Sequence, residues 1–116
     1  MAFAVAILQL IDRFPRTSGA LVVARQLAES ATSEGANYRA ACMARSRREF
    51  IAKLCIVNEE ADETVFWLEL TRRVGYRPSS EVEPLEREAM ELRAIFGRSV
   101  STARQNTKET PHQMTR

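Results

Sequence analysis

Residues 46–76 constrain the fold more than any other stretch, because they carry one long, uninterrupted helical repeat. Ser46 and Glu49 form a capping box, in which the serine oxygen accepts from free N–H groups of the first turn. Gly75 can take the left-handed conformation that ends a helix. Between them, apolar residues recur every three or four positions: Phe50, Leu54, Val57, Ala61, Val65 and Leu68. This predicts a helix of about 28 residues, roughly 42 Å long, which must pack against partners of similar length.

A first helix is predicted over residues 2–13, ended by Pro15, because proline disfavours a helical conformation in the residue before it. Both of its sides are apolar, with Phe3, Ile7, Leu10 and Ile11 on one side and Ala4 and Leu8 on the other. Such a helix is buried from more than one direction, so we expect a neighbouring subunit to contact Phe3 and Ile7. The apolar start spans only 11 residues, short of the roughly 20 that cross a bilayer, which predicts no membrane association.

A second helix, capped by Thr17 or Ser18, is predicted to run to Cys42. Its apolar stripe consists mostly of small residues: Ala20, Ala24, Leu27, Ala31, Gly35, Tyr38 and Cys42. Small side chains allow two backbones to approach closely, so we expect this helix at the crowded centre of the fold. Gly35 weakens a helix relative to alanine, which favours a packing reason for its presence.

The fourth predicted helix has the most regular apolar spacing in the chain. Ser80 and Glu83 form a second capping box, and Pro84 leaves the exact start open because proline suits only the first turn. The apolar positions are Val82, Leu85, Ala89, Leu92, Phe96, Ser99 and Ala103. Beyond them the sequence is polar and without periodicity, which is typical of a terminal tail.

Four helices with short connections predict an all-α fold, an antiparallel up-down-up-down four-helix bundle. We expect the bundle to span residues 1–105 and a flexible C-terminal tail to span residues 106–116. A single domain fits the chain length of 116 residues. No alternating apolar pattern competes as a strand.

One basic cluster stands out although the net charge is only +2 and 15 of the 17 basic residues are arginine. Arg39, Arg45, Arg47 and Arg48 surround the junction between the second and third predicted helices, with no acid among them. One interpretation is a solvated turn whose arginines pair with acids of the third helix or of a neighbouring subunit. The other is a nucleic-acid-binding patch, because clustered arginines neutralise phosphates irrespective of sequence.

Carboxylates are dense in the third predicted helix, at Glu59, Glu60, Asp62, Glu63 and Glu69. Di-iron sites in helical bundles need Glu-x-x-His units on two helices, and the single histidine, His112, lies in the predicted tail. An acidic solvated face, or a contact with arginines of another subunit, is therefore the preferred interpretation. We expect no catalytic residue, no metal site and no cofactor.

Two cysteines, Cys42 and Cys55, have no secretory signal before them and no base or metal partner, so buried apolar use is expected rather than a disulfide or a nucleophile. This usage fits the cytoplasm. Phe66 and Trp67 are expected in the core or in a subunit interface rather than as a base-stacking platform. Arginines at the end of the third helix, Arg72, Arg73 and Arg77, meet the negative end of its dipole.

Five motifs lie between residues 37 and 70: Asn37-Tyr38-Arg39-Ala40-Ala41, Arg45-Ser46-Arg47, Glu49-Phe50-Ile51-Ala52-Lys53-Leu54, Glu59-Glu60-Ala61-Asp62-Glu63-Thr64 and Trp67-Leu68-Glu69-Leu70. Together they resemble the four-helix-bundle family of proteins encoded in intervening sequences of bacterial 23S rRNA genes. The resemblance implies a left-handed bundle, a homopentameric ring and no assigned enzyme activity. The related accessory proteins of diversity-generating retroelements are similar in fold and assembly, and they bind nucleic acid and a reverse transcriptase.

Members of this family usually have a longer first helix with an aromatic-rich lead-in, so we expect one end of this bundle to be thinly covered. The resemblance favours a non-enzymatic scaffold or adaptor that binds RNA, other nucleic acid or a nucleic-acid-processing protein. The alternatives are a purely structural oligomer without nucleic-acid binding and an enzyme with an unrecognised carboxylate site. Composition and spacing alone do not separate these three hypotheses.

Overall fold

Four helices make up the computed structural model, which describes residues 1–109 and the side chains of residues 1–106. They are α1 (Ala2–Ile11), α2 (Ser18–Cys42), α3 (Arg47–Val74) and α4 (Ser79–Glu109). Within residues 1–109 there is no strand, and 86% of the structure is helical. The predicted all-α class is therefore confirmed.

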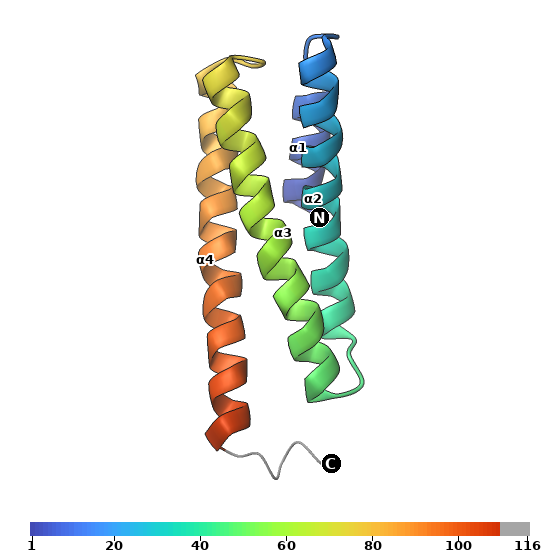
Figure 1. Ribbon diagram of the computed structural model, residues 1–116, viewed down its shortest axis with the longest axis vertical. Coiled ribbons are helices and arrows are strands. Elements are labelled where there is room, and N and C mark those ends of the chain that lie inside the picture. Colours follow the sequence, from blue (N-terminus) through green and yellow to red (C-terminus); the bar gives the residue numbers. More distant parts are fainter. Residues whose placement is uncertain (110–116) are drawn as a thin grey trace.

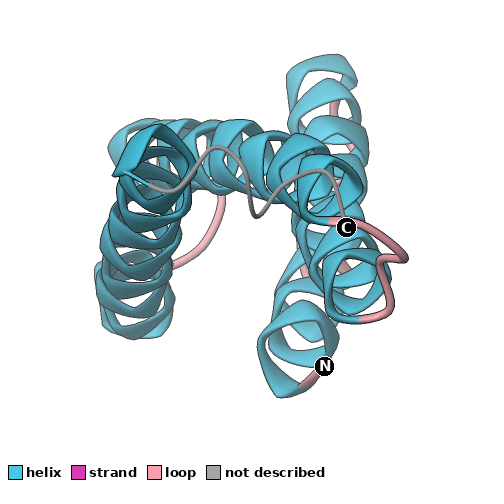
Figure 2. Cartoon of the chain, turned by 90° about the horizontal axis from the view of Figure 1, so that it is seen from below, coloured by secondary structure: helices cyan, strands magenta, loops and turns pink. Residues whose placement is uncertain are grey.

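Consecutive helices run antiparallel in an up-down-up-down order (Figure 1). α3 lies between α2 and α4 and packs on both (Figure 2). α1 packs on α2 and also contacts α4. The predicted bundle is confirmed, and its left-handedness stays a prediction. α1 has only 10 residues against 25 in α2, so it covers one half of the bundle and leaves the other half with three helices.

Local capping signals place the start of α2 and both ends of α3 where the sequence predicts them. The first helix ends at Ile11, two residues before its predicted end. The Thr17 hydroxyl accepts from the N–H of Ala20 at 3.2 Å, and the Ser46 hydroxyl accepts from the N–H of Glu49 at 3.0 Å. Gly75 ends α3 with a left-handed φ of 85°. α3 has the predicted length of 28 residues.

The fourth helix departs from the prediction at both ends. It begins at Ser79 and contains Pro84, so Ser80 lies in its first turn and is not its cap. It continues to Glu109, so residues 106–109 belong to the helix and not to the predicted tail. This polar run contains no proline or glycine, and its helix propensity suffices to extend an existing helix. Residues 110–116 of the predicted tail lie outside the described residues.

In the orientation of Figure 1, the core divides into an upper cluster, which includes residues of α1, and a lower cluster, which does not. The upper cluster contains Ile7, Leu10, Leu27, Ala31, Val65, Leu68, Val82 and Ala89, and the lower one contains Leu54, Val57, Ala61, Phe96 and Val100. The α2 stripe follows this division: Leu27 and Ala31 are buried, whereas Gly35, Tyr38 and Cys42 are exposed. The thin coverage of one end is thus confirmed, because α1 ends before it reaches these positions.

Aromatic and ionic contacts join the α1–α2 turn to the α3–α4 turn at the upper end of the bundle. The ring centroids of Phe14 and Tyr76 lie 5.6 Å apart, and Tyr76 crosses so close to Gly19 that a Cβ there would lie 2.6 Å from its hydroxyl. Glu81 forms ion pairs with Arg77 at 2.8 Å and Arg13 at 3.3 Å. The hydrogen bond from Arg77 is the main reason that the pKa of Glu81 falls to about 2.

Candidate nucleic-acid interface

The turn between α2 and α3 brings the four predicted arginines to one end of the molecule. Arg39 lies in the last turn of α2, Arg45 in the connection, and Arg47 and Arg48 in the first turn of α3. All four side chains are exposed. Because α3 begins here, its N-terminal N–H groups add the positive end of a helix dipole to the same surface.

These four guanidinium groups lack the acid partners that one interpretation of the sequence gives them. Within the described side chains of residues 1–106, no carboxylate forms an ion pair with any of the four. The nearby Glu49 carboxylate instead accepts from the backbone N–H of Arg45 at 3.2 Å. Pairing with acids of α3 is therefore wrong for the single chain, and the four charges face solvent.

A fifth arginine joins this surface from α4. Arg98 lines an open hollow of about 520 Å³ together with Arg47 and Phe50. A second hollow of about 440 Å³ lies beside it and is lined by Arg45, Arg47 and Phe50. Arg98 is distant in sequence from the other four arginines, and only the antiparallel pairing of α3 and α4 places this later turn of α4 beside the start of α3. We call Arg39, Arg45, Arg47, Arg48 and Arg98 the basic end.

Acidic residues of α3 pair with arginines away from the basic end. Asp62 accepts from Arg93 of α4 at 2.9 Å, and Glu69 pairs with Arg73 at 2.8 Å. Among the described residues, no three His, Cys, Asp or Glu side chains gather to hold a metal ion. His112 lies outside the described residues.

The two cysteines are free thiols in different surroundings. Cys42 is exposed, so the expectation that it is buried is wrong. Cys42 lies on the part of α2 that α1 does not cover. The apolar stripe of α2 is therefore exposed to solvent at this end. Cys55 is partly buried and accepts a hydrogen bond from Arg104 at 3.1 Å.

The four residues predicted at a subunit interface differ in how much surface they offer. Ile7 is 0% exposed, so its own chain covers it completely and it has no surface for a partner. Phe3 and Trp67 are partly buried against the upper core cluster. Phe66 is 57% exposed and packs edge-to-face on Trp67, with ring centroids 4.8 Å apart.

Exposed apolar side chains continue on the two N-terminal helices: Val5 and Leu8 of α1, and Leu21 and Val22 of α2. None of the described helices has both the length and the apolar character that crossing a membrane requires.

Comparisons with known proteins agree on one protein family. A family model described as 23S rRNA-intervening sequence protein matches residues 1–98. A solved crystal structure is also similar, that of a protein of unknown function from the S23 ribosomal protein family of Bacteroides thetaiotaomicron VPI-5482. The two chains are 35% identical with a TM-score of 0.77, and the match covers 85% of this chain and 92% of that one. No protein with a curated description matches.

Proposed function

This chain belongs to the 23S rRNA-intervening sequence protein family, and from that premise we propose that it is a non-enzymatic oligomeric scaffold that binds RNA through its basic end. The observation that carries the proposal is the set of exposed arginines without acid partners around the α2–α3 turn. At the upper end of the bundle, by contrast, Arg13, Arg72 and Arg77 form ion pairs.

The chemistry of the basic end suits a phosphate backbone. A guanidinium group donates two parallel hydrogen bonds to a phosphate, and the start of α3 offers further N–H donors. The hollows beside Arg47 are open, so an extended polyanion can lie across them. Neither hollow is an enclosed pocket that could select one nucleobase. We therefore expect binding that is largely independent of sequence.

Oligomerisation would multiply these contacts. We propose a closed homopentameric ring in the cytoplasm, held by the exposed apolar side chains of α1, α2 and Phe66. A ring forms when a heterologous interface closes on itself. Several basic ends then meet one RNA strand together, and multivalency raises weak single contacts to measurable affinity.

A change at Phe66 tests the assembly. Wild-type protein should have a mass near 65 kDa, about five times the 13.1 kDa of one chain, by light scattering at micromolar concentration. Phe66→Glu should shift the mass toward that of a single chain, because it places a charge in an apolar contact. The matched control is Met43→Glu, which changes an exposed apolar residue outside α1 to α4. A wild-type monomer contradicts the oligomer, and another closed ring corrects only its number.

Removing arginines tests RNA binding. The triple variant Arg45→Ala, Arg47→Ala, Arg48→Ala should reduce the slope of log affinity against log salt by roughly 2 for each engaged subunit. Each phosphate contact that is lost with single-stranded RNA accounts for about 0.7 of this slope. Fluorescence anisotropy at several salt concentrations measures this slope. A triple variant of equal charge change, Arg16→Ala, Arg25→Ala, Arg87→Ala, alters exposed arginines elsewhere and should retain the wild-type slope.

Two outcomes would overturn this proposal. The first is absence of wild-type binding to RNA and DNA at low salt, which leaves a purely structural oligomer as the better description. The second is an equal slope for wild type and the basic-end variant, which removes these arginines from the contact with RNA.

A further inference from the structure

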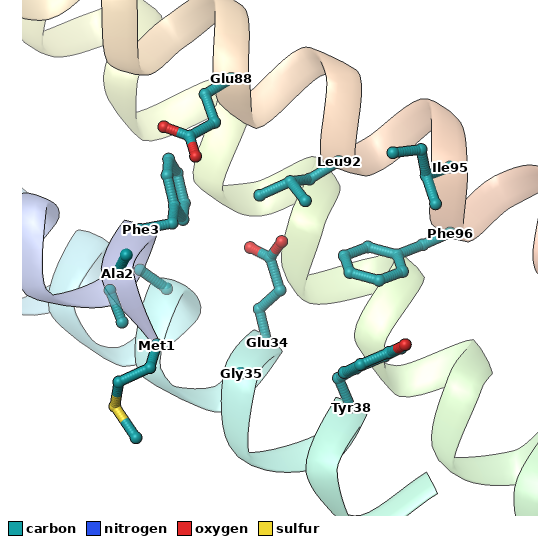
Figure 3. A pocket seen from close by; sticks show the side chains of 12 residues that line it. Met1, Ala2, Phe3, Glu34, Gly35, Tyr38, Glu88, Leu92, Ile95 and Phe96 are labelled. Carbon is teal, nitrogen blue, oxygen red and sulfur yellow. The ribbon is translucent and has the colours of Figure 1, made fainter. Parts of the chain in front are cut away.

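A pocket of about 430 Å³ lies where α1 stops short, between α1, α2 and α4 (Figure 3). Aromatic side chains reach it from three helices: Phe3 from α1, Tyr38 from α2 and Phe96 from α4. The rings of Tyr38 and Phe96 lie 5.5 Å apart and join α2 to α4 along one wall. This volume is in the range that encloses small organic molecules.

One carboxyl group is buried in this mostly apolar pocket. Glu34 is 3% exposed, and Figure 3 shows its carboxylate pointing from α2 into the space between Phe3, Leu92 and Phe96. Its Oε1 atom is buried and has no hydrogen-bond partner among the described residues. A buried acceptor without a partner costs free energy, so a ligand that satisfies it would gain from doing so.

The charges around Glu34 are mostly acidic. Glu60 of α3 acts on it electrostatically, and Glu88 of α4 lines the same pocket. Among the side chains described, residues 1–106, no lysine, arginine or histidine lines the pocket. An anionic ligand would meet these carboxylates, whereas a cation is attracted by them and by the faces of aromatic rings.

We propose that this pocket binds an apolar organic cation, such as an arylalkylammonium ion, whose charge pairs with Glu34 and lies against the rings of Phe3, Tyr38 and Phe96. The ammonium group supplies the donors that Oε1 lacks, and the apolar body fills the space beside Leu92. This site lies apart from the basic end and does not depend on the RNA-binding proposal.

Protonation of Glu34 should control the affinity. Burial raises the pKa of Glu34 to about 7, the Thr64 hydroxyl lowers it and the charge of Glu60 raises it further. With that pKa, the ionised fraction falls from about 0.9 at pH 8 to about 0.03 at pH 5.5. An alkylamine stays protonated over this range, as lysine does. Binding should therefore weaken about 30-fold from pH 8 to pH 5.5.

The probe is 4-phenylbutylamine, titrated calorimetrically into the full chain at both pH values. Its neutral counterpart, 4-phenylbutan-1-ol, has the same apolar body without the charge. We expect the amine to bind at least ten times more tightly than the alcohol at pH 8. Glu34→Gln should remove both the preference for the amine and the dependence on pH, because it keeps the shape but not the charge.

A second variant blocks the pocket without touching Glu34. Gly35 lines the pocket and a Cβ there would meet nothing within 4 Å, so we expect the side chain of Gly35→Leu to occupy part of the pocket. It should abolish binding of the amine while circular dichroism stays that of wild type. Ala36→Leu places the same leucine side chain at the adjacent exposed position, outside the pocket, and should leave binding intact.

Three results would overturn the proposal. Absence of amine binding at millimolar concentration and pH 8 shows that the pocket takes no such ligand. Equal affinity for the amine and the alcohol shows an apolar hollow without selection for charge. Unchanged binding to Gly35→Leu places the amine somewhere else on the protein.

Discussion

Replacing Arg72 by methionine should lower the free energy of unfolding by about 3 kcal/mol. Arg72 of α3 donates from Nε to Oε1 of Glu86 at 2.7 Å and from Nη2 to Oε2 at 3.2 Å. The Glu86 side chain is only 6% exposed, whereas that of Arg72 is 32% exposed. The substitution would leave a buried carboxylate of α4 without its two donors. The loss should lie at the low end of the range for broken buried pairs, because water can enter the space that Arg72 vacates.

Two companion variants distinguish this loss from a general effect of removing arginine. Arg73→Met removes the partner of the more exposed Glu69 and should cost below about 1 kcal/mol. The double variant Arg72→Met, Glu86→Met should recover most of the loss, since an apolar pair often replaces a buried ion pair at little cost. Urea unfolding at one fixed protein concentration measures all four proteins. Equal losses for Arg72→Met and Arg73→Met would show that the buried Glu86 carboxylate is not the cause of the loss.

The second large effect concerns Glu34 and the dependence of stability on pH. The unfolded chain releases this proton near pH 4.5, whereas the folded protein holds it up to about pH 7. Between these values the folded state binds more protons, so stability falls as the pH rises. A shift of this size corresponds to a loss of up to about 3 kcal/mol by pH 8. Glu34→Gln should lack this loss, and its advantage over wild type should grow from pH 4.5 to pH 8.

Two other carboxylates, Glu81 and Glu88, should not obscure this comparison. The pKa of Glu81 is lowered to about 2, so its contribution is lost only below about pH 4.5 and is common to both proteins. Glu88→Gln changes an exposed carboxylate of the same pocket and should alter stability by less than about 0.5 kcal/mol. Thermal or urea unfolding at several pH values gives the difference. Parallel stability curves for wild type and Glu34→Gln would contradict a raised pKa at this position.

The candidate sites were only partly visible in the sequence. Arg39, Arg45, Arg47 and Arg48 could be selected because they are close together along the chain. Arg98 could not, since only the pairing of α3 with α4 brings it to Arg47.

Glu34 was missed for another reason. A glutamate among small residues looks like part of a solvated face, and no local pattern shows that α3 and α4 bury it.

The helices themselves were predictable because their signals are local. Hydroxyl groups of Thr17 and Ser46 satisfy free backbone donors one turn ahead, and Gly75 adopts a conformation that other residues avoid. These interactions need no tertiary partner, so the ends of α3 and its 28 residues follow from the sequence alone. Four apolar stripes then leave a helical bundle as the way to bury them.

Tertiary packing decided which face of each helix is covered and for how much of its length. The Ala20 to Cys42 stripe of α2 has one spacing throughout, yet it is buried beside α1 and exposed beyond it, at Gly35 and Tyr38. A Cβ at Gly35 would meet no atom of the described residues within 4 Å, so close packing does not require glycine there, contrary to the expectation from its helix-weakening effect. Periodicity identifies an apolar face but not the length of the helix opposite it. The short α1 therefore creates the pocket around Glu34, because burial is a property of neighbours and only the assembled fold supplies them.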